Sequence, residues 1–434
     1  MNTLLIRNGR IIDPANDVDR IGDLYIADGR IVAVDQAPDG FTAQHDIDAS
    51  DLWVIPGIVD LSARLREPGL EYKADIASET VAATAAGITT LCVPPDTDPV
   101  IDEPAVVDLI HRKVARVGHA RVVALGALTA GLLGEHLSEM GALERAGCVG
   151  VSNGRHPISN ALVLRRSLEY AASQNITVFI EPNDGALSNE GCAHDGAIAT
   201  RLGLPPIPYA AETAAIAHTL ELMRETGVRI HFCRLSCSRS VEMIEQARAA
   251  GLLVTADVAA HQLHLTEMDI NSFNSNCHVL PPLRTQRDMD ALRRGLNADS
   301  ISAICSDHQP HEIDAKLAPF PSTEPGISAL ETLLPLTLRL VQAGELELNR
   351  AIAKLTCEPA RILGVNLGTL GKGAVADVCI VDPQAEWTLD TQQMKSRGKN
   401  TPFNGWDFTG RARYTVVKGK LVFSATQSSS SEQK

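Results

Sequence analysis

The chain of 434 residues is 44% apolar and 21% charged, which is typical of a globular protein with more than one domain. Its formal net charge is −14 at pH 7, and no basic cluster interrupts this acidic balance. The composition argues against nucleic acid and anionic membranes as partners.

Strand-like patterns dominate the first 54 residues. Apolar runs at 4–6, 10–12, 23–26 and 30–34 are separated by turn signals. The dipeptides Asn8-Gly9 and Asp28-Gly29 are typical of two-residue hairpin turns, so both are predicted to connect neighbouring strands.

The pattern changes to alternating strands and helices over the next 300 residues or so. Such an alternation favours a parallel sheet, most simply a closed (β/α)8 TIM barrel, with an open doubly wound sheet as the alternative. No Gly-x-Gly-x-x-Gly opens a helix, so a dinucleotide fold gains no support. The predicted strands are 88–93, 122–125, 150–152, 177–180, 229–233, 252–256 and 302–305, and the predicted helices include 75–86, 103–117, 159–173, 211–226, 238–250 and 286–296.

Strand patterns return near the C-terminus, at 376–382 and on both sides of Lys418-Gly419. We therefore expect two domains. Residues 55–364 form the barrel, and residues 1–54 and 365–424, from the two chain ends, together form a small β-sandwich domain. The serine-rich stretch 425–434 is predicted to be a disordered tail.

The nine cysteines are odd in number, scattered, and often placed in apolar runs. This distribution of cysteines indicates reduced, mostly buried thiols. The sequence contains no pair of CxxC motifs, so it does not indicate a structural zinc site. The N-terminus does not resemble a signal peptide, and no apolar stretch reaches membrane-spanning length. We expect a cytoplasmic protein.

A buried-strand pattern at 54–60 leads into Asp60, Arg66 and Pro68-Gly69. This stretch resembles the first barrel strand of the dihydroorotases, which are cyclic amidohydrolases. In that family the strand ends Asp-x-His-x-His-x-Arg-x-Pro-Gly, and the two histidines hold a catalytic zinc pair. Here Ser62 and Arg64 stand at the two histidine positions.

Other segments extend the resemblance from about residue 3 to residue 423. The remaining positions that match family metal ligands hold Asn153 for an aspartate, Glu181 and Arg234 for histidines, and an unchanged Asp307. The positions that match substrate contacts hold Asp96 and Leu280 in place of asparagines, together with an unchanged Arg66 and His308.

The two arginines cannot ligate a metal, because a guanidinium group stays protonated and offers no lone pair. We expect a guanidinium group to take the metal position and to pair with Asp307, with Glu181 as a further acceptor. Ser62 is interpreted as a small filler, and His231, His261 and His308 as packed or hydrogen-bonded residues. No catalytic residue, metal or cofactor is therefore predicted.

Three functions follow from the resemblance. The first is a non-catalytic dihydroorotase homologue that supports the quaternary structure of aspartate carbamoyltransferase, with the catalytic chain of that enzyme as partner and with homo-oligomer formation. The second is a working cyclic amidohydrolase that uses Asp307, His308 and Glu181 without metal. The third is a regulatory protein that binds an anionic metabolite through Arg64, Arg66 and Arg234.

Overall fold

The computed structural model describes residues 3–117 and 119–425. Within these residues, parallel strands form a ring of eight in which each strand pairs with its neighbours in chain order. The strands are short and almost entirely buried, as expected for a parallel sheet covered by helices. They are β6 (Ile58–Asp60), β7 (Ile88–Val93), β8 (Arg121–Ala127), β9 (Cys148–Ser152), β10 (Val178–Ile180), β13 (Ile230–Phe232), β14 (Val254–Ala259) and β15 (Ala303–Cys305).

The ring closes just beyond the ends of its first and last strands. The backbone N–H of Arg64 donates to the carbonyl of His308 (2.9 Å), and the N–H of His308 donates to the carbonyl of Ser62 (3.1 Å). The strand order has no switch point, and the last strand returns to the first. The predicted (β/α)8 barrel is confirmed, and the open doubly wound alternative is wrong.

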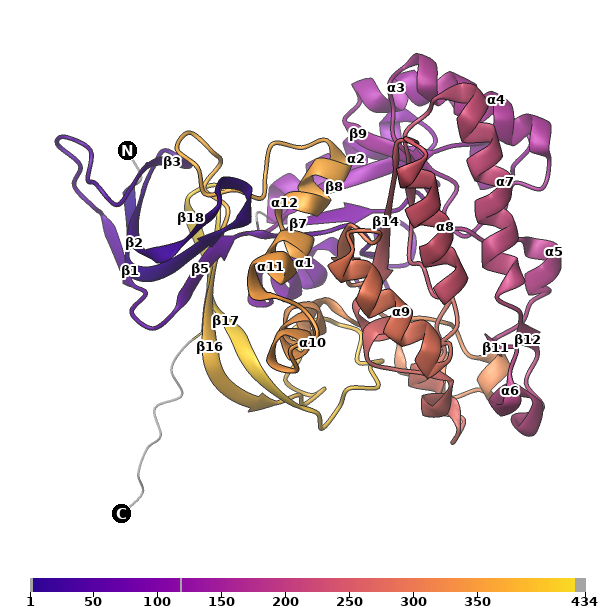
Figure 1. The fold of residues 1–434 in the computed structure, drawn as a ribbon. Helices are drawn as coiled ribbons and strands as arrows, with labels where there is room; N and C mark the ends of the chain where they lie inside the picture. The colour runs from indigo at the N-terminus through magenta and orange to yellow at the C-terminus, as the bar shows by residue number, and fades with distance from the viewer. Residues whose placement is uncertain (1–2, 118, 426–434) are drawn as a thin grey trace.

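Helices cover the outside of the barrel (Figure 1). Their starts follow local capping chemistry, because Asp75 accepts the Ser78 N–H (2.7 Å) at the first helix and Thr285 caps a later one in the same way. The helices are α1 (Ile76–Ala85), α2 (Pro104–Val117), α3 (Met140–Arg145), α4 (Ala161–Ser173), α5 (Gly185–Ser188), α6 (Ala197–Leu202), α7 (Ala210–Thr226), α8 (Ser238–Ala249), α9 (Gln286–Asn297), α10 (Leu330–Gln342), α11 (Leu348–Leu355) and α12 (Cys357–Leu363).

Strands from both chain ends form a second sheet beside the barrel, and Figure 1 shows its indigo and yellow strands together. The first strands of the chain are linked to the last ones through β5, which lies between β1 and β16. The sheet has its own core, in which Ile11 and Leu24 meet Val378 and Val416. Strands from both chain ends thus come together as expected, in a single sheet among the described residues. Its strands are β1 (Thr3–Asp13), β2 (Val18–Ala27), β3 (Arg30–Val34), β4 (His45–Asp48), β5 (Trp53–Pro56), β16 (Val378–Thr388), β17 (Asp407–Val417) and β18 (Lys420–Ser424).

One of the predicted hairpin turns is wrong. Asn8-Gly9 lies inside β1, where the pairing register shifts and Asn8 has a φ of 63°. These features are those of a β-bulge, which needs the same permissive residues as a tight turn. Asp28-Gly29 and Lys418-Gly419 do connect consecutive antiparallel strands, as predicted.

All nine cysteines carry free thiols and eight are buried, as expected from their apolar surroundings. Cys92, Cys233 and Cys305 pack together with apolar residues of the barrel strands. Of the tail predicted at 425–434, only residue 425 falls within the described residues. In the described part of the chain, every helix is too short or too polar to cross a bilayer.

Candidate functional site

Most of the predicted site residues lie together where the barrel strands end. Ser62 and Arg64 follow β6, Glu181 follows β10, Arg234 follows β13 and Asp307 follows β15. In a parallel barrel these ends share one face, which is where functional loops meet. All five side chains are more than nine-tenths buried, so their charges interact across a region that water reaches poorly.

Asp307 is the centre of this group, and its side chain is 1% exposed. Its Oδ1 lies 3.6 Å from Arg64 Nη1 and 3.4 Å from Arg234 Nε. Its Oδ2 lies 3.6 Å from Nη2 of Arg155 and accepts a hydrogen bond from Gln309 (3.0 Å). The expected pairing of Asp307 with guanidinium groups is present, and Arg155 is a third such group that the sequence did not reveal.

Glu181 is held by two of the same arginines. Its Oε1 accepts a hydrogen bond from Arg155 Nε (3.0 Å), and its Oε2 accepts one from Arg234 Nη2. Burial disfavours the charged carboxylate, but the positive charges of Arg234, Arg155 and Arg64 outweigh burial and lower the pKa of Glu181. The carboxyl is therefore ionised and fully engaged at neutral pH.

Arg64 has its closest partner in Asp96, whose Oδ2 accepts a hydrogen bond from Nε (2.8 Å). The sequence assigned Asp96 to a substrate position, where its charge would repel an anion. In the fold it neutralises Arg64, and the charge of Arg64 overcomes burial and lowers the pKa of Asp96. The two changes from the family pattern thus form one ion pair.

Ser62 is not a mere filler, contrary to its interpretation from sequence. Its hydroxyl oxygen accepts a hydrogen bond from Arg234 Nη1 (2.9 Å), and it lies 3.4 Å from Asp307 Oδ1. A small hydroxyl at this position leaves room for the guanidinium group and gives it an acceptor.

Asn153 and Leu280, which also differ from the family pattern, have other roles in the site. The amide of Asn153 accepts a hydrogen bond from Thr129 (2.7 Å) and donates to the carbonyls of Leu132 (3.2 Å) and His156 (2.8 Å), so it braces loops. Leu280 offers its backbone carbonyl to Arg155 Nη2 (2.6 Å). Its side chain helps to line a cavity beside Glu181 and Arg234.

Arg66 and His308, the two unchanged residues that match family substrate contacts, have different surroundings in the fold. Nε2 of His308 lies 2.8 Å from Glu79 Oε2, and its Nδ1 accepts the backbone N–H of Ala329 (3.0 Å). Arg66 instead contacts the ring of His311 (3.1 Å) and donates to the carbonyl of Pro310 (3.0 Å). His308 is thus a packed, hydrogen-bonded residue, as interpreted from the sequence, and His311 is the histidine beside Arg66. Both rings occur in one short motif, so sequence alone could not separate their roles.

Three of these residues have a left-handed backbone. The φ angles are 64° for Arg66, 55° for Arg234 and 47° for Asp307. Non-glycine residues rarely adopt this conformation, which costs on the order of 1–3 kcal/mol each and is concentrated at functional sites. The loops that carry these three side chains thus hold a strained backbone, and of the three only Arg234 differs from the residue expected by resemblance.

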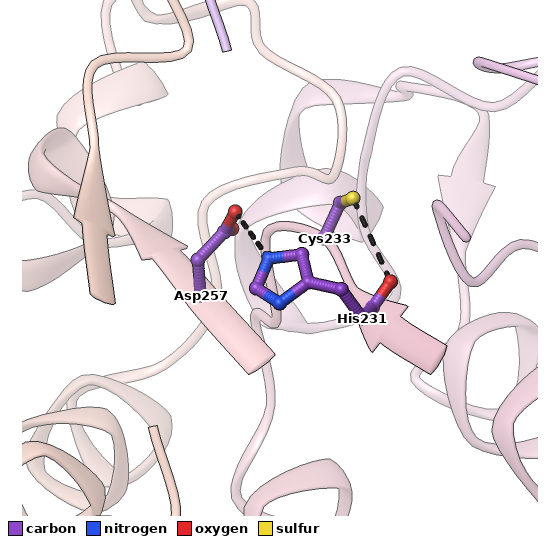
Figure 2. A group of neighbouring side chains, drawn as sticks. All are labelled: His231, Cys233 and Asp257. Carbon is purple, nitrogen blue, oxygen red and sulfur yellow. Dashed lines mark hydrogen bonds and ion pairs between the residues drawn. The ribbon is translucent and has the colours of Figure 1, made fainter. Parts of the chain in front are cut away.

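Figure 2 shows His231, Cys233 and Asp257, a buried group whose ligand atoms lie within 4.8 Å of one another. Nε2 of His231 lies 2.9 Å from Asp257 Oδ2, its Nδ1 lies 2.8 Å from Thr255 Oγ1, and Asp257 Oδ1 accepts the backbone N–H of Arg234 (2.5 Å). Burial raises the pKa of the Cys233 thiol well above its usual range. Because every nitrogen and oxygen already has a partner and the thiol is protonated, the group supports the Arg234 loop rather than a metal.

The comparisons with known proteins identify the family of the chain. The family described as "Dihydro-orotase-like" matches residues 52–240, and an "Amidohydrolase family" matches residues 327–423. A "Dihydroorotase-like protein" of Pseudomonas aeruginosa is 49% identical over 97% of this chain and 99% of its own length. A "Dihydroorotase" of Geobacter sp. (strain M21) is 43% identical over 97% of this chain and 99% of its own length. The chain belongs to the dihydroorotase family.

The fold of this dihydroorotase-family chain also matches solved structures. An L-hydantoinase (dihydropyrimidinase) from Arthrobacter aurescens superposes with a TM-score of 0.86 over 98% of this chain and 96% of the other, at 24% identity. At that identity the likeness supports the fold alone. The overall fold is therefore shared with that protein.

The zinc pair of the dihydroorotases does not fit the residues of this family member. Asp307 and Glu181 could ligate a metal, but both are already paired with guanidinium groups. A guanidinium charge about 4 Å from a dication repels it by roughly 8 kcal/mol even at an effective dielectric of about 20. That repulsion approaches the binding free energy of a structural zinc ion, about 10–16 kcal/mol.

Asp60, at the end of β6, makes stability depend on pH. Its carboxyl is fully buried, and burial outweighs the hydrogen bonds from Ser306 and Ser62 and raises its pKa from 3.8 to about 6. The folded state therefore binds more protons than the unfolded state between these two values. We expect the free energy of unfolding to fall by about 3 kcal/mol from this group as pH rises from about 4 to 6.

Urea unfolding at several pH values between 4.5 and 7 measures this effect. Asp60→Asn should lose most of the fall in stability across that interval, even if it is less stable at every pH. The exposed Asp39 provides a matched control, because Asp39→Asn should keep the wild-type dependence. Equal slopes for the wild type and Asp60→Asn would contradict the assignment.

Proposed function

We propose that this chain is a catalytically inactive dihydroorotase homologue that serves as a structural subunit of an aspartate carbamoyltransferase complex in pyrimidine biosynthesis. The observation that carries the inactive state is the set of guanidinium groups from Arg64, Arg155 and Arg234 within 3.6 Å of Asp307. They compensate Asp307, the retained carboxylate that matches a family metal ligand, and their charge opposes a dication.

A metal-free amidohydrolase is the less favoured alternative. A general base needs a free lone pair within reach of the attacking water. Asp307 and Glu181 are both engaged by arginines, and His308 is bonded to Glu79 and Ala329. None of the three side chains is therefore available, and uncatalysed amide hydrolysis is too slow for positioning alone to suffice.

Aspartate carbamoyltransferase as partner is inferred from the resemblance to non-catalytic dihydroorotase homologues. The physical support is indirect. The barrel, its closure and the second sheet are all present, although most of the positions that match family metal ligands hold other residues. Selection on a folded surface, rather than on chemistry, explains why such a large fold persists.

Co-expression of the tagged chain with the untagged carbamoyltransferase catalytic chain of the same organism tests the assembly. We expect the two chains to co-migrate in size-exclusion chromatography after affinity capture. Separate migration of the two chains at micromolar concentration would contradict the structural role.

Inactivity is tested on the purified chain. Metal analysis should find less than one zinc per chain after dialysis against zinc-containing buffer, and dihydroorotate should not be hydrolysed above the rate without protein. Stoichiometric zinc together with turnover would establish a working enzyme instead.

A further inference from the structure

A cavity of about 140 Å³ lies beside the former metal site, between the loop after β10, the start of α7 and the loop that precedes α9. Glu181 and Arg234 form the wall that the cavity shares with that site. Of the four described positions that match family substrate contacts, Leu280 alone lines the cavity. The cavity is therefore a neighbour of the former substrate site and not the same space. Its apolar lining consists of Pro182, Ile207, Ala211, Leu280, Pro281 and Pro282.

The volume of the cavity limits what it can hold. Sites for small molecules usually enclose about 300–1,000 Å³, whereas an engineered apolar cavity of about 150 Å³ holds benzene or xenon. The volume of about 140 Å³ therefore matches a molecule the size of a single six-membered ring.

Three arginines and three glutamates line the cavity, so their formal charges cancel. Arg155 and Arg234 both form ion pairs with Glu181. Both arginines also lie within 3.6 Å of Asp307, on the side of the former metal site. Carboxylates of the protein thus already compensate the positive charges on this wall, and an anion would gain little from them.

Arg284 and Glu212 are joined through Ser236 on the opposite wall. Arg284 Nε donates to Ser236 Oγ (3.1 Å), and Ser236 donates to Glu212 through its hydroxyl and through its backbone N–H (3.0 Å). Arg284 Nη1 also donates to the carbonyl of Ile207 (2.7 Å). Glu190 is exposed, so water solvates its charge. A charged ligand would lose hydration without meeting a free opposite charge, and an uncharged ligand is therefore favoured.

The loop that forms another wall of the cavity has a strained backbone. Asn189 and Glu190 follow each other with φ angles of 41° and 56°, and Ser188, Glu190 and Gly191 line the cavity. A side chain at Gly191 has no room, because a Cβ there would lie 2.4 Å from the carbonyl oxygen of Pro206. Such a backbone persists only where its surroundings determine it, and it is concentrated at functional sites. This wall is therefore preformed, as in most small-molecule sites.

We propose that the cavity binds one uncharged molecule the size of a single six-membered ring. The apolar walls contact the faces of the ring. Asn183 also lines the cavity, and its amide can donate and accept hydrogen bonds at a polar edge of the ligand. Leu280, which replaces an asparagine of the family pattern, extends the apolar wall. The loss of metal ligands does not account for that replacement, and a structural role in an assembly does not require such a site.

Thermal unfolding of the full-length chain at pH 7 tests the class of ligand. Benzene and uracil are the uncharged probes, and benzoate is the charged counterpart of benzene, with ionic strength held constant by sodium chloride. We expect a saturable rise in Tm with an uncharged ring and none with benzoate, because a ligand that binds only the folded state stabilises it by mass action. A larger effect of uracil than of benzene would assign a polar edge to the ligand, and the reverse would assign an apolar ring. No rise with either uncharged probe, or equal rises with benzene and benzoate, would overturn the proposal.

Leu280→Asn restores the residue of the family pattern and removes part of the apolar wall. The hydrogen bond from Arg155 uses the backbone carbonyl of Leu280, so it does not depend on this side chain. We expect the apparent Kd for benzene to rise at least about fourfold, as when one buried methylene loses its contact. Leu253→Asn is the matched control, because Leu253 is exposed and precedes β14 at the other end of the barrel. Equal Kd values for the wild type and both variants would place the binding elsewhere and overturn the site.

Crystals of the wild-type chain under xenon pressure provide a test without any variant. We expect an anomalous peak between Ile207, Ala211 and Leu280, because apolar cavities of this volume bind xenon. Ordered water in that place, without an anomalous peak, would refute an apolar site. None of these measurements involves the carbamoyltransferase, so this site can fail while the structural role stands, and the reverse.

Discussion

Replacing Arg234 with methionine is expected to lower the free energy of unfolding by about 3–5 kcal/mol, the usual cost of breaking a buried ion pair from one side. Arg234 is 5% exposed and contacts Glu181, Asp307 and Ser62. Methionine fills a similar volume without charge, so the loss reports electrostatics and hydrogen bonding more than a cavity. Glu181 would keep its hydrogen bond from Arg155, and Asp307 would keep its longer contacts with Arg64 and Arg155.

Urea unfolding followed by circular dichroism at pH 7 measures the loss. Arg165→Met on the surface of α4 is the matched control, and it should change stability by less than about 1 kcal/mol because exposed ion pairs contribute little. Adding Glu181→Gln to Arg234→Met should cost less than the sum of the two single changes, because both remove the same pair. A loss below 1 kcal/mol for Arg234→Met would mean that the cluster does not stabilise the barrel.

Much of the fold can be predicted from local sequence patterns. Buried apolar runs such as 88–93 and caps such as Asp75 mark strand and helix ends to within a residue or two. The failure at Asn8-Gly9 has a local cause, because a bulge and a two-residue turn need the same left-handed backbone. Only the pairing partners of β1 decide between them, and those partners lie far along the chain.

The clustering of charged residues in the site could be predicted from the sequence, but their individual contacts could not. Arg64, Arg234, Glu181 and Asp307 could be placed together, because each follows a strand end of the same barrel. Arg155 could not, since a long side chain on an irregular loop can point in many directions, and nothing in its neighbourhood fixes the one that reaches Glu181. Asp96 was misread for a related reason, because a lone substitution shows a changed charge but not the residue that neutralises it.

A fourfold variant, with histidine at the four positions where the family has ligand histidines, is expected to gain a zinc site. Imidazole nitrogens supply lone pairs that serine and arginine lack, and loss of the two guanidinium groups removes roughly 8 kcal/mol of repulsion for each one about 4 Å from the ion. Oδ1 of Asp307 then loses its contacts with Ser62, Arg64 and Arg234 and becomes free to ligate the metal, while Oδ2 keeps Arg155 and Gln309. Three or more ligands are enough for a zinc ion. The substitutions are Ser62→His, Arg64→His, Glu181→His and Arg234→His.

Zinc per chain after dialysis is the measurement, with circular dichroism as the check that the variant folds. The matched control is the twofold variant Ser62→His with Glu181→His, which adds two ligands but keeps Arg64 and Arg234. We expect it to retain no zinc, because both positive charges still face the ion from within the cluster. Equal zinc in the two variants would mean that missing ligands, and not opposing charge, keep the metal out.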